Sequence, residues 1–404
     1  MSENKLSRKN YLNKNIGNFE DIIDFNGLKY QKVEDLRYGT NPHQPAAYYK
    51  PLHANSCIGD MKILKTGKNG LSQTNLEDIS YALNIVKYFY KSKDIYVPGN
   101  YKIDMSMCTM LDSQNLTCFE YTPACAVMKH VNPSGAAVAR KKESLKDVYI
   151  KARDCDPRAA FGSVVAFNVE VDAETAAEIM SSFVECVVAP AFSNEALATF
   201  NDNKTYKLNK SIRIVKCGDL KFLPRFVGEA DKKHQTAKIL ADGSLIVAEP
   251  LLTNIRNTDD LKSAEAKNKI FGRQVSKIKA TKKQLDDLLT AWYINLNIRS
   301  NGVVIMKNGQ TLAIGTGEQD RVGAVEQAAW KYAQKYRGKE SIKDAVMASD
   351  GFFPFPDAIE VAAKAGITAI ISPSGSLKDA NVIKRANELG VALIHAPERI
   401  FSHH

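Results

Sequence analysis

An adjacent lysine and histidine, Lys129 and His130, are the residues of this sequence that best suit acid–base chemistry. A cation next to a group that titrates near neutral pH can supply charge stabilisation and proton transfer at one place. The pair follows an apolar run at 124–128 and precedes the chain-breaking sequence Asn-Pro-Ser-Gly at 132–135. This order predicts a buried strand that ends at the pair, where α/β proteins often place their chemistry. An ordinary surface pair after a strand is the alternative at this point.

Two further segments combine residue types that suit ligand binding. The sequence RYGTNPHQ at 37–44 contains a guanidinium, a phenol, an amide and an imidazole, and Arg37 has the forked shape that binds phosphate. The sequence DGFFPFPD at 350–357 places three aromatic rings in one loop, which suits a flat heterocycle with Asp357 accepting hydrogen bonds from ring nitrogens. The alternatives are a loop fixed by its own side-chain hydrogen bonds and an aromatic group in the core.

Several familiar signatures are missing from the sequence. It contains neither the G-x-x-x-x-G-K-[ST] phosphate loop nor the H-x-E and P-C-x-x-C signature of zinc deaminases. The seven cysteines are odd in number and never spaced as C-x-x-C, which argues against a disulfide framework and a structural zinc site. We therefore expect reduced thiols and no bound metal.

The elements that position these residues alternate between helices and strands. Capping boxes at 74–77 and 281–284 each precede an amphipathic helix. Asn308-Gly309, between two apolar runs, is the strongest short-range signal for a β-hairpin, and it predicts one at 302–315. The alternation predicts an α/β fold. The other expected strands are 124–128, 163–167, 184–189, 212–215, 245–248, 345–348, 367–372 and 391–395, and the other expected helices are 145–152, 173–181, 358–365 and 380–389.

The signals weaken between residues 201 and 280, where short strands lie among Lys, Asp and Gly, and we place a domain boundary there. We expect a polar leader at 1–35, a first subdomain at 36–215 and a second at 216–404. Each half alternates strands with helices, although no exact internal repeat is visible.

Composition limits the partners. The chain has 404 residues, 44% of them apolar, which suffices for two domains with substantial cores. No apolar run reaches the roughly eighteen residues of a membrane span and the N-terminus is polar, so we expect a cytoplasmic protein without a membrane partner. A net charge of +10 favours anionic partners or simply solubility. Its basic residues form no block interleaved with aromatics, so we expect a small phosphorylated or carboxylated substrate and no nucleic acid.

Seven segments, in order along the chain, resemble the AICAR (aminoimidazole carboxamide ribonucleotide) formyltransferase half of the bifunctional purine-biosynthesis enzyme. The segments are LRYGTNPHQ (36–44), KHVNPSG (129–135), DPRAAFGSVVAFN (156–168), SNGVVIMKNGQTLAIGTGEQDR (300–321), ASDGFFPFPD (348–357), ISPSGS (371–376) and ERIFSHH (398–404). The resemblance implies two cytidine-deaminase-like α/β subdomains without zinc, in a homodimer with shared active sites. It also implies transfer of a formyl group from 10-formyltetrahydrofolate, as cosubstrate, to the 5-amino group of AICAR. Since only some thirty-five residues precede Leu36, we expect the inosinate cyclohydrolase half to be absent.

The same resemblance implies roles for individual residues. His130 would be the general base, and Lys129 with Asn301 would stabilise the oxyanion. The implied nucleotide contacts are Arg37, Tyr38, Gly162, Glu185, Arg321, Arg399 and Phe401. The implied folate contacts are Val322, Phe352, Asp357, Ser376 and Leu377.

The sequence departs from the family pattern at a few positions. Val131 and Ser134 replace Thr and Cys of the form KHTNPCG, Pro356 replaces the usual Arg, and Ser402 alters the terminal F-H-H. Two other functions stay open for these residues: a zinc-free hydrolase on the deaminase fold and a catalytically silent nucleotide-binding protein.

Overall fold

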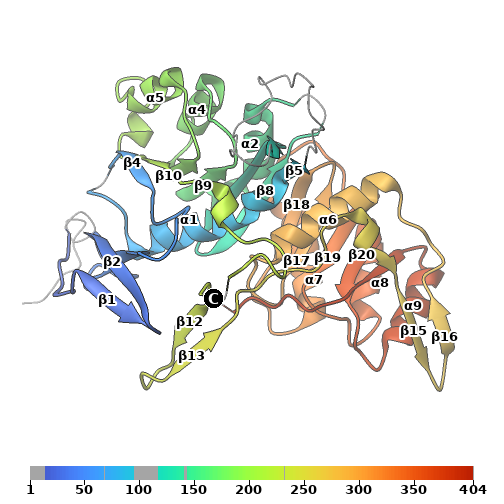
Figure 1. Cartoon of the computed structure of the whole chain (residues 1–404). Coiled ribbons are helices and arrows are strands. Elements are labelled where there is room, and N and C mark those ends of the chain that lie inside the picture. Colours follow the sequence, from blue (N-terminus) through green and yellow to red (C-terminus); the bar gives the residue numbers. More distant parts are fainter. Residues whose placement is uncertain (1–13, 68, 95–116, 141–142, 232, 404) are drawn as a thin grey trace, which may run out of the picture.

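The computed structural model describes residues 14–67, 69–94, 117–140, 143–231 and 233–403 (Figure 1). At its centre lies a mixed sheet of twelve strands in the order β14-β21-β20-β19-β17-β18-β8-β7-β9-β10-β11-β4. Helices cover both faces of this sheet (Figure 1). The expected α/β class is therefore confirmed as a mixed α/β fold.

The first half of the sheet is a hairpin followed by three parallel strands. β7 pairs antiparallel with β8 and with β9, and β10 then pairs parallel with both β9 and β11. These strands are β7 (Ala124–Lys129), β8 (Asn132–Val138), β9 (Ser163–Phe167), β10 (Val184–Ala189) and β11 (Arg213–Lys216). Each was expected within a few residues of these bounds, except β8.

The second half repeats the topology of the first. β17 pairs antiparallel with β18 and β19, and β20 pairs parallel with β19 and β21. The strands are β17 (Val303–Lys307), β18 (Gln310–Gly315), β19 (Ala345–Ser349), β20 (Ile367–Pro373) and β21 (Ala392–Ala396). The halves join where β8 pairs antiparallel with β18 through Ala137 and Gln310. The fold is thus internally duplicated, although the sequence shows no repeat.

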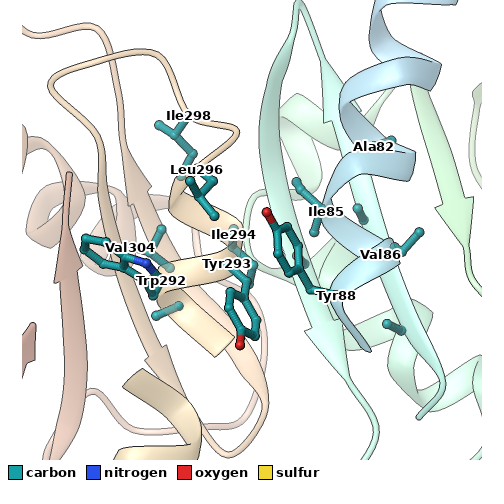
Figure 2. Packing of buried hydrophobic residues seen from close by; sticks show 14 of the residues in the cluster. Ala82, Ile85, Val86, Tyr88, Trp292, Tyr293, Ile294, Leu296, Ile298 and Val304 are labelled. Atoms are coloured by element: carbon teal, nitrogen blue, oxygen red, sulfur yellow. The ribbon is translucent and has the colours of Figure 1, made fainter. Parts of the chain in front are cut away.

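Each face of the sheet has its own helices. α1 (Gln73–Val86) and α6 (Lys282–Asn295) cover one face, where a single apolar core crosses between the halves. Tyr88, just after α1, stacks on Tyr293 of α6 with ring centroids 4.5 Å apart (Figure 2). The opposite face carries α2 (Leu145–Asp154), α4 (Ala173–Met180) and α5 (Asn194–Asn201) in the first half, and α7 (Arg321–Lys335), α8 (Asp357–Ala365) and α9 (Asp379–Glu388) in the second.

Smaller elements lie outside this core. Of the expected leader, residues 1–13 lie outside the described part, whereas β1 and β2 form a small sheet with β3. Between β11 and α6 lie the exposed hairpin β12–β13, the half-buried hairpin β15–β16 and the edge strand β14. The predicted boundary near residue 215 falls at the end of β11. The bounds are β1 (Ile22–Phe25), β2 (Leu28–Asp35), β3 (Ala47–Pro51), β4 (Lys62–Lys65), β5 (Tyr90–Asp94), β6 (Thr117–Tyr121), α3 (Pro157–Ala160), β12 (Thr236–Ile239), β13 (Leu245–Ala248), β14 (Lys262–Ser263), β15 (Glu265–Asn268) and β16 (Gly272–Val275).

Two local predictions were wrong. The capping box of α1 is formed by Ser72 and Asn75, not at 74–77, because the asparagine side chain returns the hydrogen bond to the cap backbone. The segment 132–135 does not break the sheet but begins β8, where Pro133 lies opposite Met128 at a shift in register. Gly135 is needed there because a Cβ would lie 2.1 Å from the carbonyl oxygen of Ala152 in α2. The box formed by Thr281 and Gln284 is confirmed.

Candidate active site

Lys129 and His130 lie at the tip of the β7–β8 hairpin. Lys129 is the last residue of β7 and pairs with Asn132, so His130 and Val131 are the two central residues of the turn. Both have φ of +54°, as in a type I′ turn. This backbone is unfavourable for residues other than glycine, and most of all for a β-branched residue such as Val131. The surrounding structure must therefore hold the turn.

Asp78 of α1 supports this turn from the side. Its Oδ1 accepts a hydrogen bond from the backbone N–H of Val131 at 2.7 Å. Burial raises the pKa of Asp78 to about 6, and the Val131 N–H and the nearby His130 oppose that shift. The carboxyl group of Asp78 thus lies beside His130, although Asp78 belongs to α1 and not to the β7–β8 turn.

The ammonium group of Lys129 is anchored to the start of the neighbouring strand. Its Nζ donates a hydrogen bond to the carbonyl oxygen of Phe161. Gly162, with φ of +72°, leaves room for this contact, because a Cβ there would lie 3.2 Å from Nζ. The expected contact Gly162 therefore lies directly against the ammonium group of Lys129.

Two arginines lie on the same side of the first half. Arg37 is 4% exposed and donates to the hydroxyl of Tyr38 at 2.8 Å. Arg213 is fully buried, and its guanidinium lies 3.7 Å from the carboxylate of Glu185. Burial first, and then the charge of Arg37, lower the pKa of Arg213. Asn75 completes the group by donating to Glu185 at 3.4 Å.

A second polar cluster belongs to the other half of the sheet. Arg321, at the start of α7, is ion-paired with the buried Asp350. The Phe401 ring lies near two cations, with its centroid 4.4 Å from the guanidinium of Arg399 and 5.7 Å from that of Arg321. Asn301 donates to the carbonyl oxygen of Glu318 at 2.8 Å, just before α7. Four of the expected site residues therefore gather here.

Asn132 links the two clusters. Its Oδ1 accepts from the hydroxyl of Thr316 at 2.8 Å and from the backbone N–H of Arg299 at 3.0 Å. The β7–β8 hairpin is thereby bonded to the segment that leads into Asn301. A cavity of about 330 Å³ opens beside the hairpin, lined by Lys129, His130, Asn132, Pro133, Ser134, Cys155, Asp156, Ala159, Ala313, Ile314, Thr316, Lys331 and Lys335.

The expected folate residues are not brought to this cavity. Leu377 is 93% exposed and Phe352 is 37% exposed. Asp357 accepts from the backbone N–H of Ala358 at the start of α8, and Val322 packs against the core of the second half. Among the described residues, no recorded contact joins any of the five to Lys129 or His130. One chain therefore places the two parts of the predicted site at separate locations.

Three structural findings bear on metal, thiols and membranes. Within the described ranges, no group of three or more His, Cys, Asp or Glu residues could hold a metal ion. The five cysteines whose side chains are described are buried free thiols, and Cys108 lies outside the described residues. In the same part of the chain no helix is long and apolar enough to cross a membrane.

Fold and site together define a mixed α/β protein with a polar site built on a strained β-hairpin. Residues 6–98 and 100–331 match the family described as AICARFT/IMPCHase bienzyme, and the chain belongs to this family. It is 35% identical to the bifunctional purine biosynthesis protein PurH of Acetivibrio thermocellus over 97% of this chain and 63% of the relative. The PurH proteins of Thermoanaerobacter sp. and Oceanobacillus iheyensis are 34% and 33% identical, over 98% and 93% of this chain. The chain spans about 60% of the length of these relatives.

Four residues of the site were missed by the sequence analysis. Asp78 and Asn75 lie one turn apart on α1, Arg213 lies in β11, and Asp350 opens the aromatic loop. Asp350 stood in the aromatic loop and Asn75 in the expected capping box at 74–77, but neither had been expected as a site residue. The others make contacts with residues more than fifty positions away or with backbone groups, which leave no local pattern.

Proposed function

We propose that this protein is a formyltransferase of purine biosynthesis. It transfers the formyl group of 10-formyltetrahydrofolate to the 5-amino group of AICAR, giving formyl-AICAR and tetrahydrofolate. The observation that carries the proposal is the turn with Lys129 and His130, which is fixed by Asp78 and Phe161 and bonded through Asn132 to the segment that leads into Asn301. Membership of the family supports it. The matching topology of the two halves supports two cytidine-deaminase-like subdomains.

The proposed mechanism assigns each proton and bond. The amine of AICAR is a weak nucleophile because its lone pair is delocalised toward the carboxamide, so His130 removes its proton as nitrogen attacks the formyl carbon. The oxyanion that forms is stabilised by the ammonium of Lys129 and the amide of Asn301. The bond from the formyl carbon to the folate nitrogen then breaks, and that nitrogen leaves with the proton.

The buried cations support a phosphorylated nucleotide as the substrate. Arg37 and Arg213 lie near each other at low exposure, and buried guanidinium groups suit phosphate. Tyr38 and Glu185 lie against these arginines, and Gly162 would contact the nucleotide beside Lys129. Arg321, Arg399 and Phe401 would bind the nucleotide from the second half.

The separation of the folate residues supports a homodimer with shared sites. All eight strand residues of the β12–β13 hairpin, which projects from the body in Figure 1, are exposed. Ile239 is 75% exposed and Ile246 is 49% exposed, and exposed apolar strands of this kind are usually covered by a partner. A second copy seated here would cover these side chains, and shared sites would require the folate residues of one chain to lie near Lys129 of the other. Mixing His130→Ala with the folate-side variant Asp357→Ala should then restore part of the activity, because one of the two sites would be intact, whereas full activity of a monomer would contradict shared sites.

The direct test is turnover of AICAR with 10-formyltetrahydrofolate, followed by release of tetrahydrofolate. A zinc-free hydrolase would release ammonia without folate, and a silent binding protein would bind nucleotide without turnover. The same reaction tests whether inosinate forms, and its absence stays a prediction. We further propose a cytoplasmic location, with no metal, nucleic acid or membrane among its partners.

A further inference from the structure

The internal duplication gives the catalytic hairpin a counterpart. The β17–β18 hairpin has the same two-residue turn, formed by Asn308 and Gly309, and a shift in register at the matching position. Asp78 and Asp287 are each the sixth residue of a fourteen-residue helix that begins with a capping box. Asp287 accepts the backbone N–H groups of Asn308 and Gly309 at 2.8 and 2.9 Å. The contact between helix and turn therefore occurs in both halves.

The two aspartates differ in what else they contact. Asp287 is ion-paired with Arg140 at 2.9 Å and supports an Asn-Gly turn, which adopts positive φ readily. Asp78 supports a His-Val turn, which does not. Among the described contacts of Asp78, none is an ion pair with Arg or Lys. Its hydrogen bond to Val131 is thus directed at the residue whose backbone is least favourable.

We propose that Asp78 is a positioning residue that holds Val131 in the left-handed conformation and thereby fixes the direction of His130. The inference rests on the proposed function, since His130 is the base only in that account. Without the acceptor, Val131 would relax toward an ordinary conformation. His130, its neighbour in the turn, would then leave its position beside Lys129. Small displacements of a catalytic group reduce turnover strongly without affecting substrate binding elsewhere.

Three variants test this role through turnover. Asp78→Ala removes the acceptor and should lower kcat about 10- to 100-fold, with the KM for AICAR within about threefold of wild type. Asp78→Asn keeps an oxygen acceptor and should stay within about threefold of the wild-type kcat. Adding Val131→Gly to Asp78→Ala should restore most of the lost kcat, because glycine adopts positive φ unaided. Asp287→Asn is the matched control and should leave kcat unchanged.

A second readout separates this inference from the proposed function. Hydrogen exchange of the segment 129–132 should increase in Asp78→Ala and stay at the wild-type level in Asp78→Asn. If the wild type shows no formyl transfer, the proposed function fails and the exchange result still tests the contact. If the wild type is active but Asp78→Ala keeps its kcat, or Asp78→Asn loses as much as Asp78→Ala, the positioning role is wrong. If Asp78→Ala does not fold, the kcat and exchange of Asp78→Asn decide.

Discussion

The two hairpins of the duplicated sheet have the same turn conformation but different residues in the turn. In the second half the turn sequence Asn308-Gly309 fits its backbone, and Lys307 is ion-paired with Glu340 at 3.2 Å in addition to donating to two backbone carbonyl oxygens. In the first half His130 and Val131 occupy the same backbone against their preference, and Lys129 contacts a carbonyl oxygen. Natural proteins tend to break local rules at functional sites and to compensate nearby. We therefore expect the first hairpin to serve the proposed chemistry and the second to serve stability.

Removing the imidazole should have the largest effect. His130→Ala should lower kcat by roughly two to four orders of magnitude, the range of a lost general base, with AICAR affinity largely unchanged. Asn308→Ala, at the matching position of the second hairpin, should leave kcat within about twofold. Steady-state turnover and separate binding titrations measure both. A His130→Ala variant with more than about a tenth of wild-type turnover would mean that another group is the base.

Replacing Lys129 and Lys307, one in each hairpin, should distinguish the roles of the two hairpins in a second way. Lys129→Met should reduce kcat by at least about 100-fold, because the developing oxyanion loses its cation. Lys129→Arg should recover little, since a broad planar fork cannot replace a compact ammonium. Lys307→Met should affect only the thermal midpoint. Equal losses of kcat for Lys129→Met and Lys307→Met would erase the distinction between the hairpins.

The pH dependence of stability should reveal the buried carboxyl at Asp78. Its pKa of about 6 lies above the unfolded value near 3.8, so its contribution to stability is full below pH 3.8 and is lost as pH rises through 6. Asp78→Asn cannot ionise, so it should be more stable than wild type above pH 6, by on the order of 3 kcal/mol, and equal to it near pH 3.5. Urea unfolding at several pH values measures the difference. A constant difference at all pH values would assign the effect to another group.

Relieving the backbone strain at Val131 should have the smallest effect of these changes. Val131→Gly should stabilise the protein by about 1 kcal/mol, because strain at positive φ exceeds the entropy cost of glycine. Gly309→Ala should have the opposite sign, since a Cβ there would lie 2.5 Å from the carbonyl oxygen of Val138. Denaturant midpoints at equal slope report both changes. Destabilisation by Val131→Gly would show that the His-Val turn is not strained.

Local patterns predicted most of the elements but not their arrangement. The strands at 163–167 and 184–189 and the Asn308-Gly309 hairpin have the expected bounds, because alternating or continuous apolar runs and turn residues are local signals. The duplication was invisible, since matching positions such as His130 and Asn308 share backbone conformation and not residue type. The start of α1 was misplaced because two polar sequences compete for one cap.

From the sequence, many residues of the site could be named, but their contacts could not be predicted. The clusters around Lys129 and around Asn301 contain residues that were expected, and the roles of those residues stay predictions. Asp78 could not be found from the sequence, because its partner is a backbone N–H fifty-three residues away. The proposed role of Asp78 depends on the positive φ of Val131, a conformation that a sequence-based prediction would not assign to a valine.

Transfer of an isotopically labelled formyl group tests the central claim most directly. With ¹³C-formyl tetrahydrofolate and AICAR, the wild-type protein should place one labelled formyl group on the 5-amino nitrogen for each tetrahydrofolate released. Asn308→Ala should do the same, and His130→Ala should do so at least about 100-fold more slowly. Release of unlabelled product, release of ammonia without folate, or equal rates for the two variants would contradict the account.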